Sequence, residues 1–395
     1  MLVHLFKLIW KRKKLNALII AEVAIAFMIV FAISSTAIHQ YRLYIEPLGF
    51  EYHNMWNLRF SGISNPWQDD RDPLQLRQVV RTLKQQSEIK KVHLLKNPTF
   101  IHWRGSSSYE LDGKNFHFLR NYMDDDAPET FGMKIIKGRW FGIQDEGQGY
   151  RPTIVNRRFV EEFYPNEDPI GKNIARKTDD QGNILKEQRI VGVFEDFRQQ
   201  GELNKLTPYV IYRYDINSGG KIHNIEIKLR EGINISYEKK LMELLNDIAP
   251  SWKFSINPWE ESRQTALDEA LTPLVFGAII ASFFILLVAM GLFGVLWQNV
   301  TSRTPEIGLR QAIGATTTGI HLQIISELLI VTLLGIMIAF IILVQLPILG
   351  DLSWSLFWSG QAASILFMIL LSVSCAYYPG KLATKLSPAE ALHYE

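Results

Sequence analysis

The chain has almost no cysteine. Cys375 is the only one among 395 residues, so no intrachain disulfide can form and no second thiol is available for a Cys–His zinc site. The GxxxxGKS/T phosphate loop, the GxSxG element and the HExxH element are also missing from the sequence. We therefore expect no catalytic residue, no metal, no cofactor and no enzyme activity in this chain.

Charge of either sign is not in excess. Forty-two Lys and Arg stand against 40 Asp and Glu, a formal net charge of +2, and no basic stripe gathers on one soluble segment. This balance argues against a nucleic-acid partner. The histidines of the polar part of the chain are scattered, so we expect surface or core positions for His53, His93, His102, His117 and His223. The acidic run Asp124–Asp126 lacks the spacing of a calcium loop and predicts a solvated turn before a strand.

Long apolar stretches are what the sequence has in plenty. They are Leu15–Ile38, Pro273–Trp297, Leu328–Leu349 and Ala362–Tyr378, and the uncharged run around the last one extends from Leu352 to Gly380. About 20 helical residues cross a hydrocarbon core of about 30 Å. We expect an α-helical membrane protein with four transmembrane helices, one before and three after a large insert. The first stretch exceeds a signal-peptide core of about 7–15 residues, which favours an uncleaved anchor.

Lys and Arg in short segments predict the orientation. Nine of them flank the apolar stretches on one side, and the short loop around Asp351 carries none. They are Lys7, Lys11, Arg12, Lys13, Lys14, Arg303, Arg310, Lys381 and Lys385. We therefore expect both termini in the cytoplasm and the insert outside, as in a multi-pass protein of a bacterial inner membrane.

The N-terminal segment has a helical apolar stripe. Its members are Leu2, Leu5, Phe6, Ile9 and Trp10, with lysines on the opposite face. This pattern predicts an amphipathic helix that lies in the inner interface, with membrane lipid as its partner. A plain extension of the first span is the alternative.

The insert alternates helical and strand-like segments, which predicts an α+β domain of one lobe or two. Pro73 follows a capping Asp72 and precedes a helical stripe of Leu76, Val79, Val80 and Leu83, and Ile235–Ile248 predicts a second helix. The strand candidates are His53–Phe60, Lys91–Leu95, Pro152–Asn156, Arg189–Phe194, Tyr209–Tyr212 and Asn224–Leu229. A turn is expected at Asn217–Gly220.

Glu22 is the one acid well inside a predicted span. An intramembrane acid is a candidate functional residue by default. The alternative is a structural acid that pairs with a polar group of a neighbouring helix or reaches the interface.

The segment between the second and third apolar stretches predicts a short helix of about nine residues. Thr304 can cap it, Pro305 suits its first turn, and Glu306 and Arg310 are spaced to pair. Leu309, Ala312 and Ile313 share a face, Gly314 ends the helix, and Thr316–Thr318 offer a cap for the next one. Such a helix fits a cleft on a cytoplasmic partner, and the alternative is a simple elbow between two spans.

Several motifs resemble those of the FtsX/MacB-like ABC transporter permeases. The segment Glu306–Ala315 is similar to the family's EIGLR-A-GA motif, and Leu386–Leu392 to its C-terminal dPxeAL ending. In the insert, Gly138–Phe141 resembles a GRxF element, Val155–Lys172 a vN…fFp…dPiGk stretch, and Val191–Phe197 a VVGVvkDF stretch. The order of these motifs covers nearly the whole chain. Pro305, His393 and Glu22 depart from the family's pattern.

The resemblance implies a permease subunit that couples ATP hydrolysis by a separate cytoplasmic ATPase to periplasmic work in export, efflux or mechanotransmission. Its expected partners are a cytoplasmic ABC ATPase dimer, which would hold ATP and Mg²⁺, a second permease copy or paralogue, and a periplasmic adaptor or cargo. The implied ATPase-coupling residues are Arg303, Glu306, Ile307, Leu309, Arg310 and Gly314. Two alternatives stay open: a regulator that activates a periplasmic cell-wall hydrolase, and a membrane-anchored structural protein without an ATPase.

The expected boundaries follow from these observations. They are an amphipathic helix at 1–14, transmembrane helices at 15–38, 272–298, 321–349 and 362–380, a MacB-like periplasmic core domain at 39–271, a cytoplasmic coupling loop at 299–320, a short periplasmic loop at 350–361 and a cytoplasmic tail at 381–395.

Overall fold

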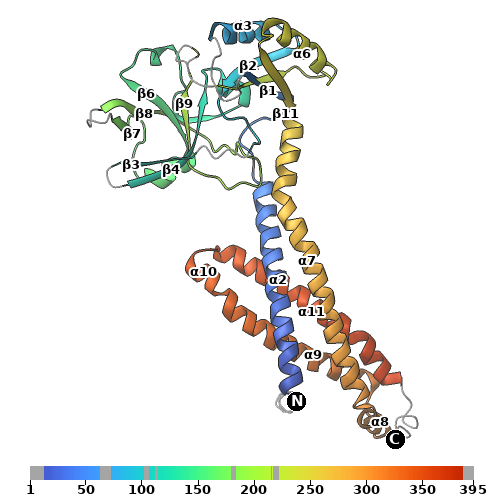
Figure 1. Cartoon of the computed structure of the whole chain (residues 1–395). Helices are drawn as coiled ribbons and strands as arrows, with labels where there is room; N and C mark the ends of the chain where they lie inside the picture. Colours follow the sequence, from blue (N-terminus) through green and yellow to red (C-terminus); the bar gives the residue numbers. More distant parts are fainter. Residues whose placement is uncertain are drawn as a thin grey trace. The chain divides into compact units, whose positions relative to one another are not determined.

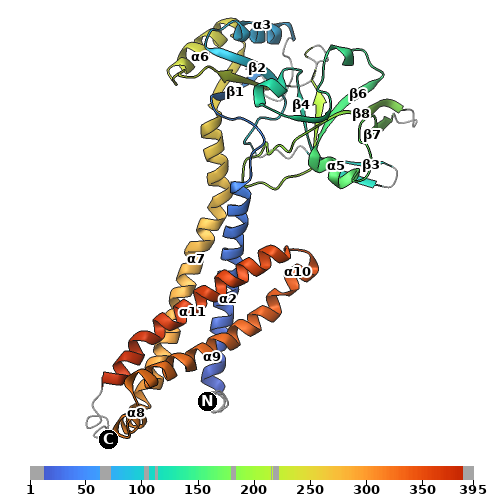
Figure 2. The ribbon, with the colours of Figure 1, turned by 180° about the vertical axis from the view of Figure 1, so that it is seen from behind.

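The computed structural model describes residues 13–62, 73–101, 106–111, 114–178, 184–214, 216 and 222–385. They fall into two compact units, Leu43–Ala270, here the sheet unit, and Met1–Arg42 with Leu271–Glu395, here the helical unit. Figures 1 and 2 show both. Most of the predicted amphipathic helix at 1–14, the capping Asp72, the turn at Asn217–Gly220 and the motif Leu386–Leu392 lie outside the described residues.

The described part of the sheet unit contains one sheet of 11 strands. The main path is β11-β1-β10-β2-β4-β9-β6-β8-β5, with β3 paired to β4 and β7 paired to β8. The pairs β4–β9 and β6–β8 are parallel and the other pairs are antiparallel. The strands are β1 (Met55–Gly62), β2 (Ile89–Leu95), β3 (Ser106–Leu111), β4 (Lys114–Met123), β5 (Ile135–Gly138), β6 (Tyr150–Asn156), β7 (Asn173–Thr178), β8 (Ile184–Phe194), β9 (Tyr209–Arg213), β10 (Asn224–Leu229) and β11 (Trp252–Pro258).

Helices cover the sheet at both ends of this strand order. The helices are α3 (Pro73–Lys84), α4 (Ala127–Phe131), α5 (Arg157–Phe163) and α6 (Tyr237–Ile248), with a 3₁₀ turn at Ile143–Asp145. One core cluster joins α3 and α6 to β1, β2, β10 and β11, and another joins α5 to β4, β6, β8 and β9. Leu76, Val79 and Leu83 of α3 and Leu241 and Leu245 of α6 are buried, as their helical spacing predicts. The α+β interpretation is therefore confirmed.

The acidic run Asp124–Asp126 differs from its prediction. It leads into α4 rather than a strand, and its side chains are engaged rather than only solvated. Asp124 Oδ2 accepts the backbone N–H of Leu94 at 2.8 Å, and Asp125 pairs with Arg213 through two bonds of 2.6 and 2.8 Å. Local sequence could not show this, because both partners come from strands that are distant along the chain.

The helical unit is built from long helices. They are α2 (Lys13–Ile45), α7 (Trp259–Thr301), α9 (Thr317–Leu343) with the short α10 (Gln345–Leu349), and α11 (Trp354–Lys385). Among the described residues, four helical segments are long and apolar enough to cross a membrane. The first residues of α7 belong to the sheet unit. Helix α11 begins at Trp354 and so includes most of the segment 350–361, which was expected as a short loop.

Glycines set how α2 packs in the helical unit. Gly291 of α7, Gly335 of α9 and Gly360 of α11 each approach a side chain of α2. A Cβ atom at Gly291 would lie 2.6 Å from Glu22 Oε1, and one at Gly335 would lie 2.7 Å from a methyl group of Val23. Small residues allow helices to pack closely where lipid gives no hydrophobic drive between them. Each of the other three long helices therefore meets α2 at a glycine.

Candidate functional site: the elbow between α7 and α9

The segment 302–316, here the elbow, joins α7 to α9 through the nine-residue helix α8 (Thr304–Ala312). Pro305 lies in its first turn, where a missing N–H costs nothing. The predicted Thr304 cap is wrong: Thr304 is the first helical residue, and its hydroxyl donates to the Thr301 carbonyl at 3.0 Å. Gly314 has a φ of 99°, which the left-handed end of the helix requires.

The next helix starts as its sequence predicts. The Thr316 hydroxyl accepts the backbone N–H of Gly319 at 3.2 Å and caps α9. A capped start and a glycine stop give the elbow two defined ends.

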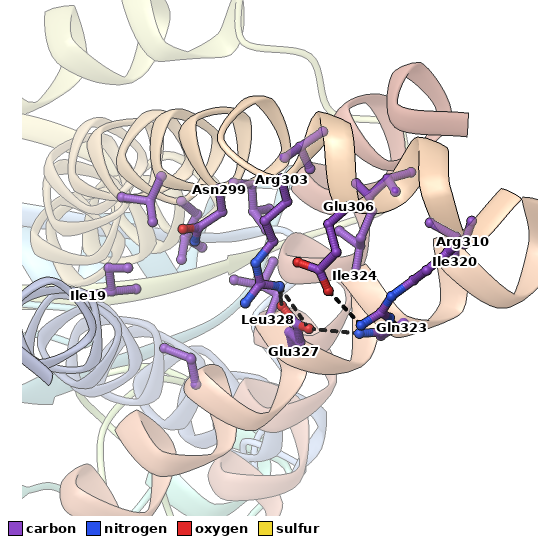
Figure 3. A pocket seen from close by; sticks show the side chains of 16 residues that line it. Ile19, Asn299, Arg303, Glu306, Arg310, Ile320, Gln323, Ile324, Glu327 and Leu328 are labelled. Carbon is purple, nitrogen blue, oxygen red and sulfur yellow. Dashed lines mark hydrogen bonds and ion pairs between the residues drawn. The ribbon is translucent and has the colours of Figure 1, made fainter. Parts of the chain in front are cut away.

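Five polar side chains connect α8 to α9, and we call them the elbow ring. They are Arg303, Glu306, Arg310, Gln323 and Glu327 (Figure 3). Arg303 Nη1 donates to Glu327 Oε2 at 2.8 Å and to Oε1 at 3.1 Å, and Gln323 Nε2 donates to Glu327 Oε1 at 3.2 Å. Arg310 donates to Gln323 Oε1 at 3.0 Å and to Glu306 Oε1 at 2.6 Å. The predicted pair of Glu306 and Arg310 is therefore confirmed.

Within the elbow ring, Arg303 and Glu327 are less exposed to solvent than Glu306. The side chains of Arg303 and Glu327 are 21% and 22% exposed, and Glu306 is 53% exposed. Two arginines and two glutamates make the ring formally neutral. A cavity of about 80 Å³ lies beside it, with apolar walls from α2, α7 and α9 that include Ile19 and Leu292. The Arg303–Glu327 pair is thus partly withdrawn from water, where an ion pair is screened less than on an open surface.

The six predicted coupling residues have three different placements in the structure. Arg303, Glu306, Ile307 and Arg310 line the cavity and face α9. Leu309 is 54% exposed, and Ile313 beyond the helix is 78% exposed. Gly314 shapes the turn. The elbow therefore has an inner polar side that contacts α9 and an outer side with exposed apolar side chains.

Sequence reasoning missed Gln323 and Glu327. Helix α9 begins at Thr317, so Glu327 lies within a helix that is long enough to span a membrane. Glu22 is therefore not the one acid inside such a helix. The available signal was an i, i+4 pair of polar residues just before the apolar run that begins at Leu328.

Glu22 is separate from the elbow cavity. Its carboxylate fits against Gly291, which has no side chain to oppose it. Within the described part of the chain, neither a hydrogen bond nor an ion pair of Glu22 occurs. The described residues also contain no cluster of three or more His, Cys, Asp and Glu that could hold a metal ion.

Two of the glycine-containing motifs of the sheet unit, Gly138–Phe141 and Val191–Phe197, lie next to each other. Gly138 on β5 lies opposite Gly192 on β8. A Cβ atom at Gly138 would collide with the Val191 carbonyl oxygen, and one at Gly192 with the carbonyl oxygen of Arg139, just after β5. Next to them, Arg139 binds the buried Asp145 carboxylate through two bonds of 2.6 and 2.7 Å. Burial alone would raise the pKa of Asp145, but Arg139 and the Gly142 N–H outweigh it and hold that pKa below its ordinary value. These motif residues therefore have a structural role.

A second buried carboxyl holds the start of α7. Glu226 on β10 is fully buried, and it accepts the Trp259 indole N–H at 2.7 Å and the Asn57 amide N–H at 2.9 Å. Burial raises the pKa of Glu226 to about 8, against the smaller opposite effect of these donors. His93 lies opposite Glu226 on β2 and is also fully buried. No sequence pattern pointed to Glu226.

Comparisons with known proteins cover most of the chain. Residues 15–241 match the family of the MacB-like periplasmic core domain, and residues 278–388 match the family of the FtsX-like permease C-terminal domain. The macrolide export ATP-binding/permease protein MacB of Mannheimia succiniciproducens is 27% identical over 274 residues, or 67% of this chain and 41% of that protein. Its namesake in Bdellovibrio bacteriovorus is 26% identical over 66% of this chain and 41% of that protein.

The chain therefore spans about two fifths of the length of these curated relatives. Among solved structures, the periplasmic region of MacB from Actinobacillus actinomycetemcomitans aligns with a TM-score of 0.39 at 19% identity, covering 57% of this chain and 97% of that chain.

Proposed function

Because the chain belongs to the FtsX/MacB-like permease family, we propose that it is the membrane-spanning subunit through which a separate cytoplasmic ATPase drives conformational work in the sheet unit. ATP and Mg²⁺ would be held by that partner. The product of the work would be export, efflux or a relayed mechanical signal. The names of the relatives, which refer to macrolide export, support the hypothesis of transport.

The main support for this proposal is the outer side of the elbow, where apolar side chains are exposed. A nine-residue helix is too short to be stable alone, and here it is held from one side by the elbow ring. The other side leaves Leu309 and Ile313 exposed next to the half-exposed Glu306. This short helix therefore presents large apolar side chains beside a carboxylate. Such a surface is suited to bind in a cleft of another protein.

The distribution of Lys and Arg supports an orientation with the elbow and both termini in the cytoplasm. The sheet unit would then lie in the periplasm and the helical unit in the inner membrane. The exposed face of α7, which includes Phe276, Ile280, Phe283 and Met290, would contact lipid or a second permease copy. An adaptor or cargo would meet the sheet unit, and Glu22 is an intramembrane candidate without an assigned role.

Copurification with substitutions on the elbow tests the docking role. A cytoplasmic ABC ATPase should copurify with this chain, and Leu309→Asp or Ile313→Asp should weaken that association at least about tenfold, because each buries a charge in an apolar contact. Thr318→Asp is the matched control, since Thr318 is an exposed residue just beyond the elbow. Normal association of both apolar-to-acid variants would contradict the docking role.

Coupling is a separate measurement in the same complex. Glu306→Ala and Gly314→Val should leave an ATPase that hydrolyses ATP but no longer changes the protease sensitivity of the sheet unit. Gly314→Val forces a β-branched residue into a left-handed conformation and so redirects the turn into α9. If both variants couple normally, or if protease reaches the sheet unit only from the cytoplasmic side, the proposed function is wrong.

A further inference from the structure

Two polar side chains of α9, those of Gln323 and Glu327, bond to arginines at the two ends of α8. Gln323 accepts from Arg310 near the end of α8, and Glu327 accepts from Arg303 just before its start. Gln323 also donates to Glu327. The two attachment points therefore share one carboxylate, and Glu327 orients the amide that holds the other end.

The surroundings of Glu327 distinguish it from an ordinary surface acid. Its side chain is partly buried, next to Leu328 and Ile324 on the wall of the elbow cavity. In the described part of the chain, Arg303 has no carboxylate partner other than Glu327, because the bond of Glu306 goes to Arg310. The pair thus joins two helices at one point, and no second ion pair among the described residues duplicates it.

Helix α9 is in turn closely connected to the rest of the helical unit. The Thr332 hydroxyl bonds to the Ser372 hydroxyl of α11 at 2.9 Å, and both side chains are buried. Gly335 lets α9 approach Val23 and the Ile20 carbonyl of α2. A displacement that enters α9 is therefore passed to α2 and α11 through close contacts.

We propose that Glu327 is the positioning residue that makes α8 and α9 move as one body, so that a load on the elbow enters the bundle through α9. The source of the load rests on the proposed function, and the attachment itself does not. Without the carboxylate, Arg303 can turn to Glu306, three residues further along α8. The ionic contacts would then close within α8, so α8 would be held to α9 less firmly and would open more often, while Leu309 and Ile313 remain on its exposed side.

Hydrogen exchange of the full-length chain in lipid nanodiscs tests the attachment. Glu327→Gln keeps the size of the side chain and removes its charge. We expect the backbone amides of α8 to lose protection about tenfold, and the exchanged pair Arg303→Glu with Glu327→Arg to restore it. Ser326→Ala, next to Glu327 on α9, is the control and should match the unaltered chain.

A second measurement adds the copurified ATPase and ATP. In the unaltered complex, ATP should change the exchange of α9. In Glu327→Gln the ATPase should still bind, because Leu309 and Ile313 are untouched, and the ATP-dependent change in α9 should be lost. The charge-exchanged chain should recover that change, which a general loss of stability would not allow.

Three results would overturn the proposal. They are unchanged protection of α8 in Glu327→Gln, failure of the exchanged pair to restore protection, and an ATP-dependent change in α9 that survives Glu327→Gln. A chain that binds no ATPase at all would instead contradict the proposed function. The first measurement needs only this chain and still decides the attachment in that case.

Discussion

Replacement of the buried Glu226 by glutamine should change how the stability of the sheet unit depends on pH. The folded pKa of Glu226, about 8, lies above its ordinary value of 4.5. A raised pKa means that the folded state binds the proton more tightly than the unfolded state does. The stabilising contribution is therefore complete below about pH 4.5 and is lost as the pH rises through about 8.

The size of the effect follows from these two values. Each tenfold difference in proton affinity corresponds to about 1.4 kcal/mol. Ionisation of Glu226 should lower the free energy of unfolding by about 4 kcal/mol between about pH 5 and pH 9. Glu226→Gln does not ionise in this range and removes that slope. Glutamine can also fit, because Asn57 Oδ1 is buried without a partner and can accept from the new amide after a flip.

Hydrogen exchange of β1 and β10 in the full-length chain measures this difference, after correction for the intrinsic pH dependence of exchange. Glu231→Gln is the matched control, since Glu231 is an exposed glutamate just after β10, and it should keep the slope of the unaltered chain. Equal slopes in Glu226→Gln and the unaltered chain would refute the reasoning.

Two further substitutions test the packing of each unit. Asp145→Asn should destabilise the sheet unit by about 3 kcal/mol, because it leaves Arg139 without its buried partner. The folded pKa of Asp145 is depressed, so its carboxylate stabilises the fold above the ordinary pKa of 3.8 and this stabilisation is lost in stronger acid. Denaturant unfolding at several pH values should therefore show a smaller difference between the two proteins in strong acid. Gly335→Leu should lower the melting temperature of the detergent-solubilised chain, because its Cβ would press on Val23. Gly294→Leu is the control, since a Cβ there meets nothing within 4 Å. Equal melting temperatures of the two variants would argue against close packing at Gly335.

The elbow shows which parts of a site are visible in a sequence. Pro305, the Glu306–Arg310 spacing and Gly314 act within a few residues of one another, so they predicted a short helix with a defined end. Glu327 lies 24 residues from Arg303, and its role depends on how α8 folds back against α9. Chain neighbours carry no information about that contact, so the residue that attaches the elbow was missed.

The same distinction holds for the whole molecule. Four apolar runs and their flanking charges were enough to predict the spans, because crossing hydrocarbon requires length and apolarity from each segment separately. Alternation of helical and strand-like stretches likewise predicted an α+β insert. Tertiary structure alone placed Glu226 beneath Trp259 and Asp125 beside Arg213, since these contacts join strands and helices that are far apart along the chain. Burial then changed the chemistry of Glu226, and burial belongs to the folded arrangement rather than to any residue in its sequence context.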